Sequence, residues 1–297
     1  MKSLQLLAPL VVALVCVPAP AWAQPVLGSE LSSFAVLGAA AVTNTGATTL
    51  TGNLGVSNNA SLTGITGFFG TLANEGPGTA TGVIHQGDAF AITADGQLVN
   101  AMTSLGLMGP GMLLGVDLVG LTLAPGVYTV AAGVSNLTGR LTLDGGGNAD
   151  AFWVFQMAST LITSPGSFVD VINTGAGAGV YWNVGSSATL DTGTTFEGNI
   201  LASASITFND AVTLSCGRAL AHTGAVTMIG DTVNALGCIG TGGEGSNGWS
   251  GGLTVSGPPG SIATPIPEPE TYALMLAGLG FLGLVARRNK RRTAAQS

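Results

Sequence analysis

Most of the chain from Ser29 to Leu236 consists of short segments in which apolar residues alternate with small polar residues such as Thr and Ser. Turn-forming Gly, Pro and Asn residues bound these segments. The pattern predicts β-strands that direct one face to a core and the other to solvent. The expected strands include residues 34–37, 126–130, 140–143, 151–157, 167–172 and 179–184.

Residues 87–107 have a different period. Apolar side chains such as Phe90, Leu98 and Met102 are spaced as on one face of a helix, and few residues of this segment are β-branched. A Gly-Pro-Gly sequence at 109–111 provides a stop signal just beyond it. The segment is therefore predicted to form an amphipathic α-helix that covers apolar strand surface on the flank of the domain.

A repeat with a period near twenty residues occupies the C-terminal half of the strand-rich region. Thr189, Thr207 and Thr227 are 18 and 20 residues apart, and Gly198 and Gly217 are 19 residues apart. A period of this length, built from short strands, is typical of a solenoid. Each turn of the coil is expected to place its threonines on those of the next turn.

An N-terminal segment repeats the same sequence far from the other copies. Residues 43–54 read TNTGATTLTGNL and closely match residues 191–200, which read DTGTTFEGNI. The predicted helix and a differently spaced region separate the two copies. The turns therefore need not stack in sequence order, and an N-terminal turn can lie beside C-terminal ones.

Alternation within each turn predicts which side chains face outward together. With Leu190, Phe208 and Met228 directed inward, one plane carries Thr189, Thr207 and Thr227 as a row. Asp191, Asn209 and Ile229 extend these strands, Ser187 and Ser205 add a flanking row, and Thr192 to Thr195 turn the corner. A second plane would hold Thr195, Glu197, Thr213 and Ser215. A third would expose Asn199, Arg218 and His222.

Both ends of the chain have features of targeting segments. A basic start, an apolar run from Leu4 to Val17 and the sequence Ala-Trp-Ala at 21–23 predict a signal peptide over residues 1–23.

Residues 265–297 contain Pro267, Glu268 and Pro269, an apolar stretch at 272–286 and a basic tail. This order resembles the PEP-type sorting signal of Gram-negative bacteria. The resemblance implies processing by an exosortase-type enzyme, transient membrane insertion of the apolar helix, and delivery to the cell surface or beyond. A plain single-helix membrane anchor is the alternative.

Charge narrows the range of partners. Outside the two ends the chain keeps thirteen acidic residues and only Arg140 and Arg218 as basic ones, a net charge of −11. Nucleic-acid binding is excluded, because phosphate recognition requires clustered Lys and Arg.

Residues 24–240 are predicted to form the solenoid domain, followed by a Gly/Ser/Pro-rich linker over residues 241–264.

Two cysteines remain outside the signal peptide. In an exported domain Cys216 and Cys238 suggest one disulfide that ties the last coil to the segment after it. Two buried, reduced thiols are the alternative.

A series of ordered motifs resembles one family. They include Leu37 to Gly46, Leu121 to Tyr128, Phe152 to Gln156, Phe196 to Ala202 and Gly217 to Ala221. Together they are similar to the bacterial and fungal ice-binding proteins of the discontinuous β-solenoid type, from about residue 29 to residue 234. The resemblance implies a right-handed parallel β-helix of triangular section, one long helix beside it, a flat ice-binding face, and secretion by cold-living microbes.

The first plane is the predicted ice-binding face. Its small β-branched hydroxyl side chains can each hold water through one hydrogen bond and one methyl group in a fixed rotamer. Asp191 and Ile229 depart from an ideal threonine array. The alternative is that threonines merely suit exposed strands. The predicted site residues are Ser187, Thr189, Thr192, Thr195, Ser205, Thr207, Asn209 and Thr227.

Signals for catalysis or for a cofactor are weak. His85 and His222 stand alone, without the clustered ligands of a metal site. We expect no cofactor, no metal and no enzymatic activity. A structural protein of the cell surface or biofilm matrix is the main alternative function. A β-helical polysaccharide lyase or hydrolase is a weaker one, because the domain has few bases.

Overall fold

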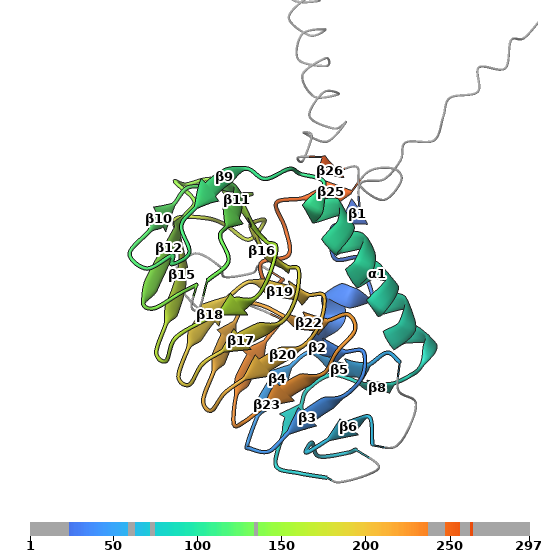
Figure 1. Ribbon diagram of the computed structural model, residues 1–297. Coiled ribbons are helices and arrows are strands. Elements are labelled where there is room, and N and C mark those ends of the chain that lie inside the picture. Colours follow the sequence, from blue (N-terminus) through green and yellow to red (C-terminus); the bar gives the residue numbers. More distant parts are fainter. Residues whose placement is uncertain are drawn as a thin grey trace, which may run out of the picture.

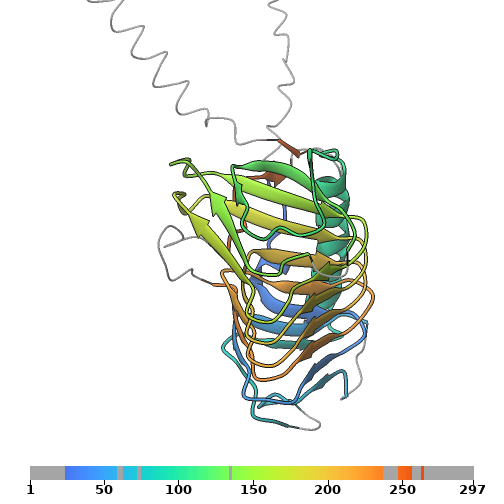
Figure 2. The ribbon, with the colours of Figure 1, turned by 60° about the vertical axis from the view of Figure 1, so that its left-hand side comes forward.

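The computed structural model describes residues 24–58, 63–71, 75–133, 136–236, 247–255 and 262–263. Three parallel sheets form the three faces of a coiled chain, so that the molecule is a β-solenoid of triangular section (Figures 1 and 2). The expected architecture is confirmed. The predicted signal peptide and the sorting segment at 265–297 lie outside the described residues.

Each sheet runs the length of the stack, and the spatial order of its strands differs from their order in the chain. From one edge to the other, the nine-stranded sheet contains β8 (Ile84–Gln86), β5 (Asn53–Val56), β2 (Phe34–Gly38), β22 (Ala219–Ala221), β19 (Asn199–Ala202), β16 (Gly179–Val184), β13 (Phe152–Met157), β11 (Gly126–Val130) and β9 (Met112–Leu114). The six-stranded sheet contains β14 (Leu161–Ile162), β17 (Ala188–Leu190), β20 (Ile206–Phe208), β23 (Val226–Met228), β3 (Val42–Asn44) and β6 (Ile65–Thr66).

The eight-stranded sheet contains β10 (Thr122–Leu123), β12 (Arg140–Asp144), β15 (Phe168–Ile172), β18 (Thr195–Glu197), β21 (Thr213–Ser215), β24 (Thr232–Asn234), β4 (Thr49–Thr51) and β7 (Thr79–Ala80). A small antiparallel sheet, the terminal sheet, joins β1 (Gln24–Pro25), β25 (Thr254–Val255) and β26 (Ile262–Ala263). The helical elements are a 3₁₀ turn, η1 (Leu31–Ser33), and α1 (Ala89–Gly106).

The coils stack out of sequence order. The last C-terminal coil pairs with the first N-terminal coil on all three faces, through Leu220 with Leu37, Thr227 with Thr43, and Val233 with Leu50. The predicted N-terminal turn beside C-terminal turns is thus confirmed. Helix α1 makes this order feasible, because its 18 residues span about 27 Å and carry the chain from β8, at one end of the stack, toward β9 at the other.

Apolar side chains fill the inside of the coil. Consecutive strands of the nine-stranded sheet stack their aromatic rings, and the ring centres of Phe155 and Trp182 lie 3.9 Å apart. Phe196 contributes from the eight-stranded sheet, and Phe208 contributes from the six-stranded sheet. This continuous core requires each strand to direct alternate residues inward, which is the alternation that the sequence shows.

Helix α1 covers the outer surface of the nine-stranded sheet. Its small buried face, with Ala94, Leu98 and Ala101, packs against outward-facing strand residues such as Leu201 and Leu220. The Asp88 side chain caps the helix by accepting the Ala91 N–H at 2.9 Å. The predicted helix at 87–107 and its position on the flank are confirmed.

Two expectations are corrected. Arg218 and Asn199 are not exposed on a third plane, because the C-terminal segment and the N-terminal turn bury both completely. His222 faces α1 and lies 3.1 Å from Asp95.

Residues 247–255 do not form a free linker, because Trp249 is 1% exposed and packs into the solenoid core.

No helix in the described part of the chain is long and apolar enough to cross a membrane, and the apolar stretch at 272–286 lies outside that part. Cys216 takes part in a disulfide. Its expected partner Cys238 is not among the described residues, so the pairing stays a prediction.

Candidate functional site

A straight row of hydroxyl side chains crosses the six-stranded sheet. The four central strands of this sheet, β17, β20, β23 and β3, bury the residues on either side of one outward-facing position. The backbone pairings place these outward positions side by side on neighbouring strands. In spatial order the row reads Ile162, Thr189, Thr207, Thr227, Thr43 and Thr66. We call its five consecutive threonines the first threonine row.

The five threonines of the first threonine row are half-buried, and few of their hydroxyls are bonded within the protein. The Thr43 hydroxyl donates a hydrogen bond to the Thr227 hydroxyl at 3.3 Å. Within the described residues the hydroxyls of Thr189, Thr207 and Thr66 have no hydrogen-bond partner. The row thus presents polar groups at the spacing of parallel strands, about 4.8 Å, with water as their natural partner.

Other predicted site residues flank this row. Ser187 and Ser205 immediately precede the adjacent strands β17 and β20, and the Ser187 hydroxyl accepts the Ser205 N–H at 3.3 Å. On the other side the Asn209 amide donates to the Asp191 carboxylate at 2.8 Å. This bond, followed by the Thr192 N–H, lowers the pKa of Asp191. Ile229 is 38% exposed and interrupts this side of the surface.

The structure does not bring all predicted site residues onto one plane. Thr192 is exposed at the corner after β17. Thr195 is the first residue of β18 and belongs to the eight-stranded sheet, where it pairs with Thr213. The polypeptide turns between Asp191 and Thr195, because the Thr194 N–H closes a turn onto the Asp191 carbonyl at 3.1 Å. Thr195 is therefore removed from the predicted face.

Sequence reasoning missed two members of the first threonine row, Thr43 and Thr66. Their strands precede the helix, so the local repeat at 189–234 does not include them. The match between residues 43–54 and 191–200 was the signal that could have located Thr43. For Thr66 no comparable match exists, and only the pairing of β6 with β3 reveals it.

The corner between the six- and eight-stranded sheets is held by buried polar side chains. Thr163 and Thr194, on neighbouring coils, are hydrogen-bonded at 3.0 Å. Farther along the stack Asp231 accepts the Val212 N–H at 2.8 Å, while its own N–H donates to Thr48 at 3.0 Å. Burial raises the pKa of Asp231 to about 6, although the N–H groups of Ile229 and Val212, which its carboxyl accepts, lower it. Because these contacts join consecutive coils, they fix the edge shared by the two sheets.

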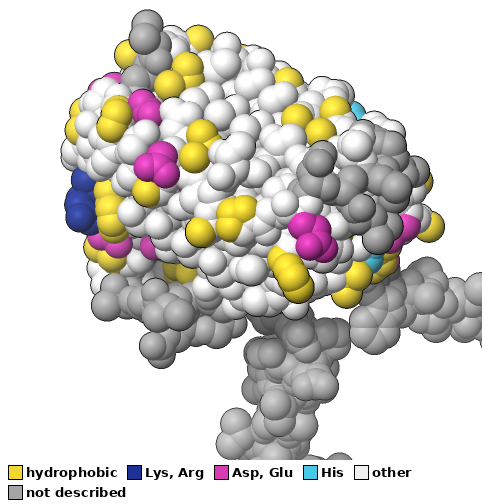
Figure 3. All heavy atoms as spheres, turned by 90° about the horizontal axis from the view of Figure 1, so that it is seen from below, with side chains coloured by type: hydrophobic (Ala, Val, Ile, Leu, Met, Phe, Trp, Pro, Cys, Tyr) yellow, Lys and Arg dark blue, Asp and Glu magenta, His cyan; other side chains and the backbone are white. Residues whose placement is uncertain are grey.

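The eight-stranded sheet carries one ion pair, on β12 and β15, and one largely buried carboxyl on β18. Arg140 lies 2.9 Å from Asp170, and its guanidinium lies over the Phe168 ring at 4.2 Å. Glu197 accepts the Trp249 indole N–H at 2.8 Å, and burial raises the pKa of this carboxyl to about 7. In the view of Figure 3 charged side chains are few and scattered, and most of the surface is neither charged nor hydrophobic.

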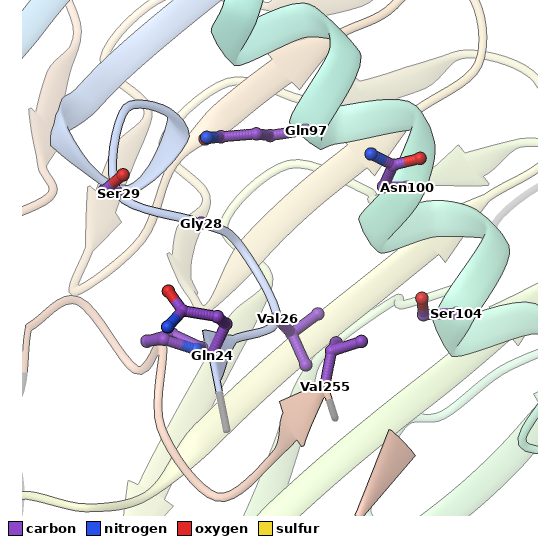
Figure 4. A pocket seen from close by; sticks show the side chains of 9 residues that line it. Gln24, Val26, Gly28, Ser29, Gln97, Asn100, Ser104 and Val255 are labelled. Atoms are coloured by element: carbon purple, nitrogen blue, oxygen red, sulfur yellow. The ribbon is translucent and has the colours of Figure 1, made fainter. Parts of the chain in front are cut away.

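A small cavity lies away from these sheets, between α1 and the two terminal segments (Figure 4). Its volume is about 250 Å³, and its lining includes Gln24, Gln97, Asn100, Ser104 and Val255. Among the described residues there is no cluster of three or more His, Cys, Asp or Glu side chains that could hold a metal ion.

Fold and surface together define a class of protein: a parallel β-solenoid that presents a flat, hydroxyl-bearing face. The comparison with family models identifies the family. The chain belongs to the ice-binding-like family, whose model matches residues 36–234. The model of the PEP-CTERM protein-sorting motif matches residues 265–292.

Individual relatives agree with this assignment. The chain is 45% identical over 198 residues to an ice-binding protein of Nostoc sp. (strain HG1), covering 66% of this chain and 69% of that protein. The crystal structure of an ice-binding protein from the Antarctic ascomycete Antarctomyces psychrotrophicus superimposes with a TM-score of 0.62 at 36% identity, covering 69% of this chain and 96% of that one. An ice-binding protein from an Antarctic biological consortium gives 0.59 at 36% identity, covering 73% and 95%.

Proposed function

We propose that this chain is an exported, non-enzymatic protein that adsorbs to ice through the six-stranded sheet. The observation that carries the proposal is the first threonine row, five threonines in register on five consecutive strands. The names of the relatives, which are ice-binding proteins, support the choice of ligand.

A row of threonines suits a crystal of water for physical reasons. Each hydroxyl can exchange a hydrogen bond with a lattice water, the adjacent methyl favours an ordered shell, and the β-branched rotamer holds both groups in place. One such bond contributes only about 1 kcal/mol net against liquid water. Adsorption therefore depends on many groups held at a fixed spacing, which the backbone pairing provides.

The six-stranded sheet is favoured because the described segments outside the coils lie elsewhere. Helix α1 covers the nine-stranded sheet. The segment at 247–255 follows the edge between the nine- and eight-stranded sheets, where Ser250 bridges to Gly179 and Trp249 reaches Glu197. A flat crystal can approach the six-stranded sheet without displacing either element.

Adsorption explains how such a protein would act. Bound molecules pin the advancing crystal front, and the ice between them must curve, which lowers its local freezing point.

The PEP-CTERM match supports processing by an exosortase-type enzyme and a location at the cell surface or beyond. A signal peptide ending at Ala23 and a transient membrane stage of the apolar C-terminal helix complete this proposed route.

The substitution Thr207→Tyr tests the proposed face. A chain of residues 24–263 contains every element that the structure describes, so it is the protein to assay. The bulky ring at the middle of the first threonine row should remove most of the thermal hysteresis and of the inhibition of recrystallisation. Stability should change by no more than about 0.5 kcal/mol, because the position is on the surface.

A parent protein without any effect on recrystallisation would favour the structural surface-protein alternative instead. Equal hysteresis in the parent and in Thr207→Tyr would show that the six-stranded sheet does not bind ice.

A further inference from the structure

A second row of threonines runs across the adjoining eight-stranded sheet. The backbone pairings align one outward-facing threonine on each of five consecutive strands. In spatial order they are Thr195, Thr213, Thr232, Thr49 and Thr79. We call this set the second threonine row. It crosses the junction between the C-terminal and N-terminal coils, as the first threonine row does.

This sheet presents a wider array than the six-stranded sheet. Its strands bury their middle residue, for example Leu214 and Val233, and so turn two residues outward instead of one. Beside the second threonine row the outward positions form two adjacent pairs, Glu197 with Ser215 and Asn234 with Thr51. The Glu197 carboxyl, at the β18 edge, accepts the Trp249 indole N–H. From β21 onward the result is a grid of small polar groups with repeats of about 4.8 Å across the strands and about 6.6 Å along them.

The threonines of the second threonine row differ in their hydrogen bonding from the buried threonines at the corner of the sheets. The buried Thr194 and Thr48 use their hydroxyls internally, on Thr163 and on Asn44. Among the described residues the hydroxyls throughout the second threonine row have no partner, and Thr232, Thr49 and Thr79 are exposed. These groups therefore direct their hydrogen-bonding capacity to the solvent.

Exposure alone does not account for the threonines. In register with the second threonine row, β15 carries Phe168 and β12 carries Arg140. The neighbouring outward column on these strands carries Asp170 and Thr142. The change from charged or aromatic residues to threonine occurs at β18 and persists to β7. Outward positions in this register therefore do not have to carry threonine. The run of five threonines from β18 to β7 requires another explanation.

We propose that the part of the eight-stranded sheet from β18 to β7 is a second ice-binding surface. This inference rests on the proposed function and extends it, because the two sheets share a rigid corner but face different directions. One molecule would then adsorb to two differently oriented sets of ice planes, one set through each threonine row.

The test is to image adsorption of the fluorescently labelled 24–263 protein on a single ice crystal, with three Thr→Tyr variants. Thr213→Tyr blocks the second threonine row, and Thr207→Tyr blocks the first. Thr142→Tyr is the matched control, because it makes the same change on β12, beside the Arg140–Asp170 pair and outside the proposed surface. Melting temperatures verify folding, and Thr232→Arg replaces Thr213→Tyr if that variant unfolds.

We expect each of the two row variants to lose a different set of decorated planes, the double variant to lose both, and Thr142→Tyr to lose neither. Loss of all planes in Thr207→Tyr and of none in Thr213→Tyr would overturn the second surface and leave the proposed function intact. The opposite result would support the eight-stranded sheet and overturn the six-stranded one. Full decoration by the double variant would overturn both surfaces.

Discussion

At the residue scale, the buried Arg218 illustrates how far a side chain can differ from its expected place. Its guanidinium donates to the Ser32 carbonyl at 2.6 and 2.9 Å, to the Asn199 side chain at 2.8 Å and to the Gly248 carbonyl at 3.1 Å. Burial lowers its pKa to about 10, so it stays charged at neutral pH. Carbonyl oxygens satisfy this charge, and in doing so they hold both terminal segments to the coil.

Glu197 provides a pH dependence that can be measured. Burial raises its pKa to about 7 from an ordinary 4.5. Because the folded state holds the proton more tightly, this group stabilises the fold fully below pH 4.5, and that stabilisation is lost as the pH rises through 7. The difference corresponds to about 3 kcal/mol in the free energy of unfolding.

We therefore expect Glu197→Gln to flatten the pH dependence of the free energy of unfolding over this interval and to be the more stable protein above it. Urea denaturation of parent and variant across that pH range measures the effect. The exposed Glu75→Gln is the matched control. Parallel curves for the parent and Glu197→Gln would show that this carboxyl is not protonated in the fold.

At the element scale, the regular parts were predictable and the C-terminal segment was not. Residues 87–107 already show helical periodicity, and α1 occupies Ala89–Gly106. Residues 247–255 lack any period and are rich in Gly and Ser, so nothing local distinguishes them from a linker. They are ordered because Trp249 and Leu253, each 1% exposed, fill sites on the coil.

Truncation tests the role of this segment. A chain of residues 24–246 loses the buried Trp249, and removal of a buried aromatic side chain typically costs about 3–5 kcal/mol. We expect its thermal unfolding midpoint to fall clearly below that of the 24–263 chain, as followed by circular dichroism. Trp249→Ala should reproduce most of the loss, and identical midpoints would mean that the segment is a linker after all.

At the scale of the whole molecule, both terminal segments meet at one end of the stack. β1 pairs with β25 beside α1, and the chain leaves through β26 (Figure 1). Any tether or processed tail that follows residue 263 therefore starts at an end of the solenoid, away from the middle of both threonine rows. This arrangement suits a protein that acts while it is attached to a surface.

A fusion experiment addresses this arrangement. A fluorescent protein joined after Ala263 should leave the inhibition of recrystallisation at least as strong as in the 24–263 chain at equal molarity, because the added mass does not cover either sheet. An equimolar mixture of the two separate proteins is the control. A marked loss of inhibition in the fusion would indicate that ice contacts the end of the molecule that carries the terminal sheet.

The sequence by itself determined the repeat, the strands, the helix, the acidic and lysine-free domain, and three of the five threonines of the first threonine row. These follow from local alternation and spacing along the chain. Only the tertiary structure decided that Thr43 and Thr66 extend that row and that Arg218 is buried. Each depends on contacts between residues distant in the chain, and the local period of about twenty residues does not specify which coils lie side by side.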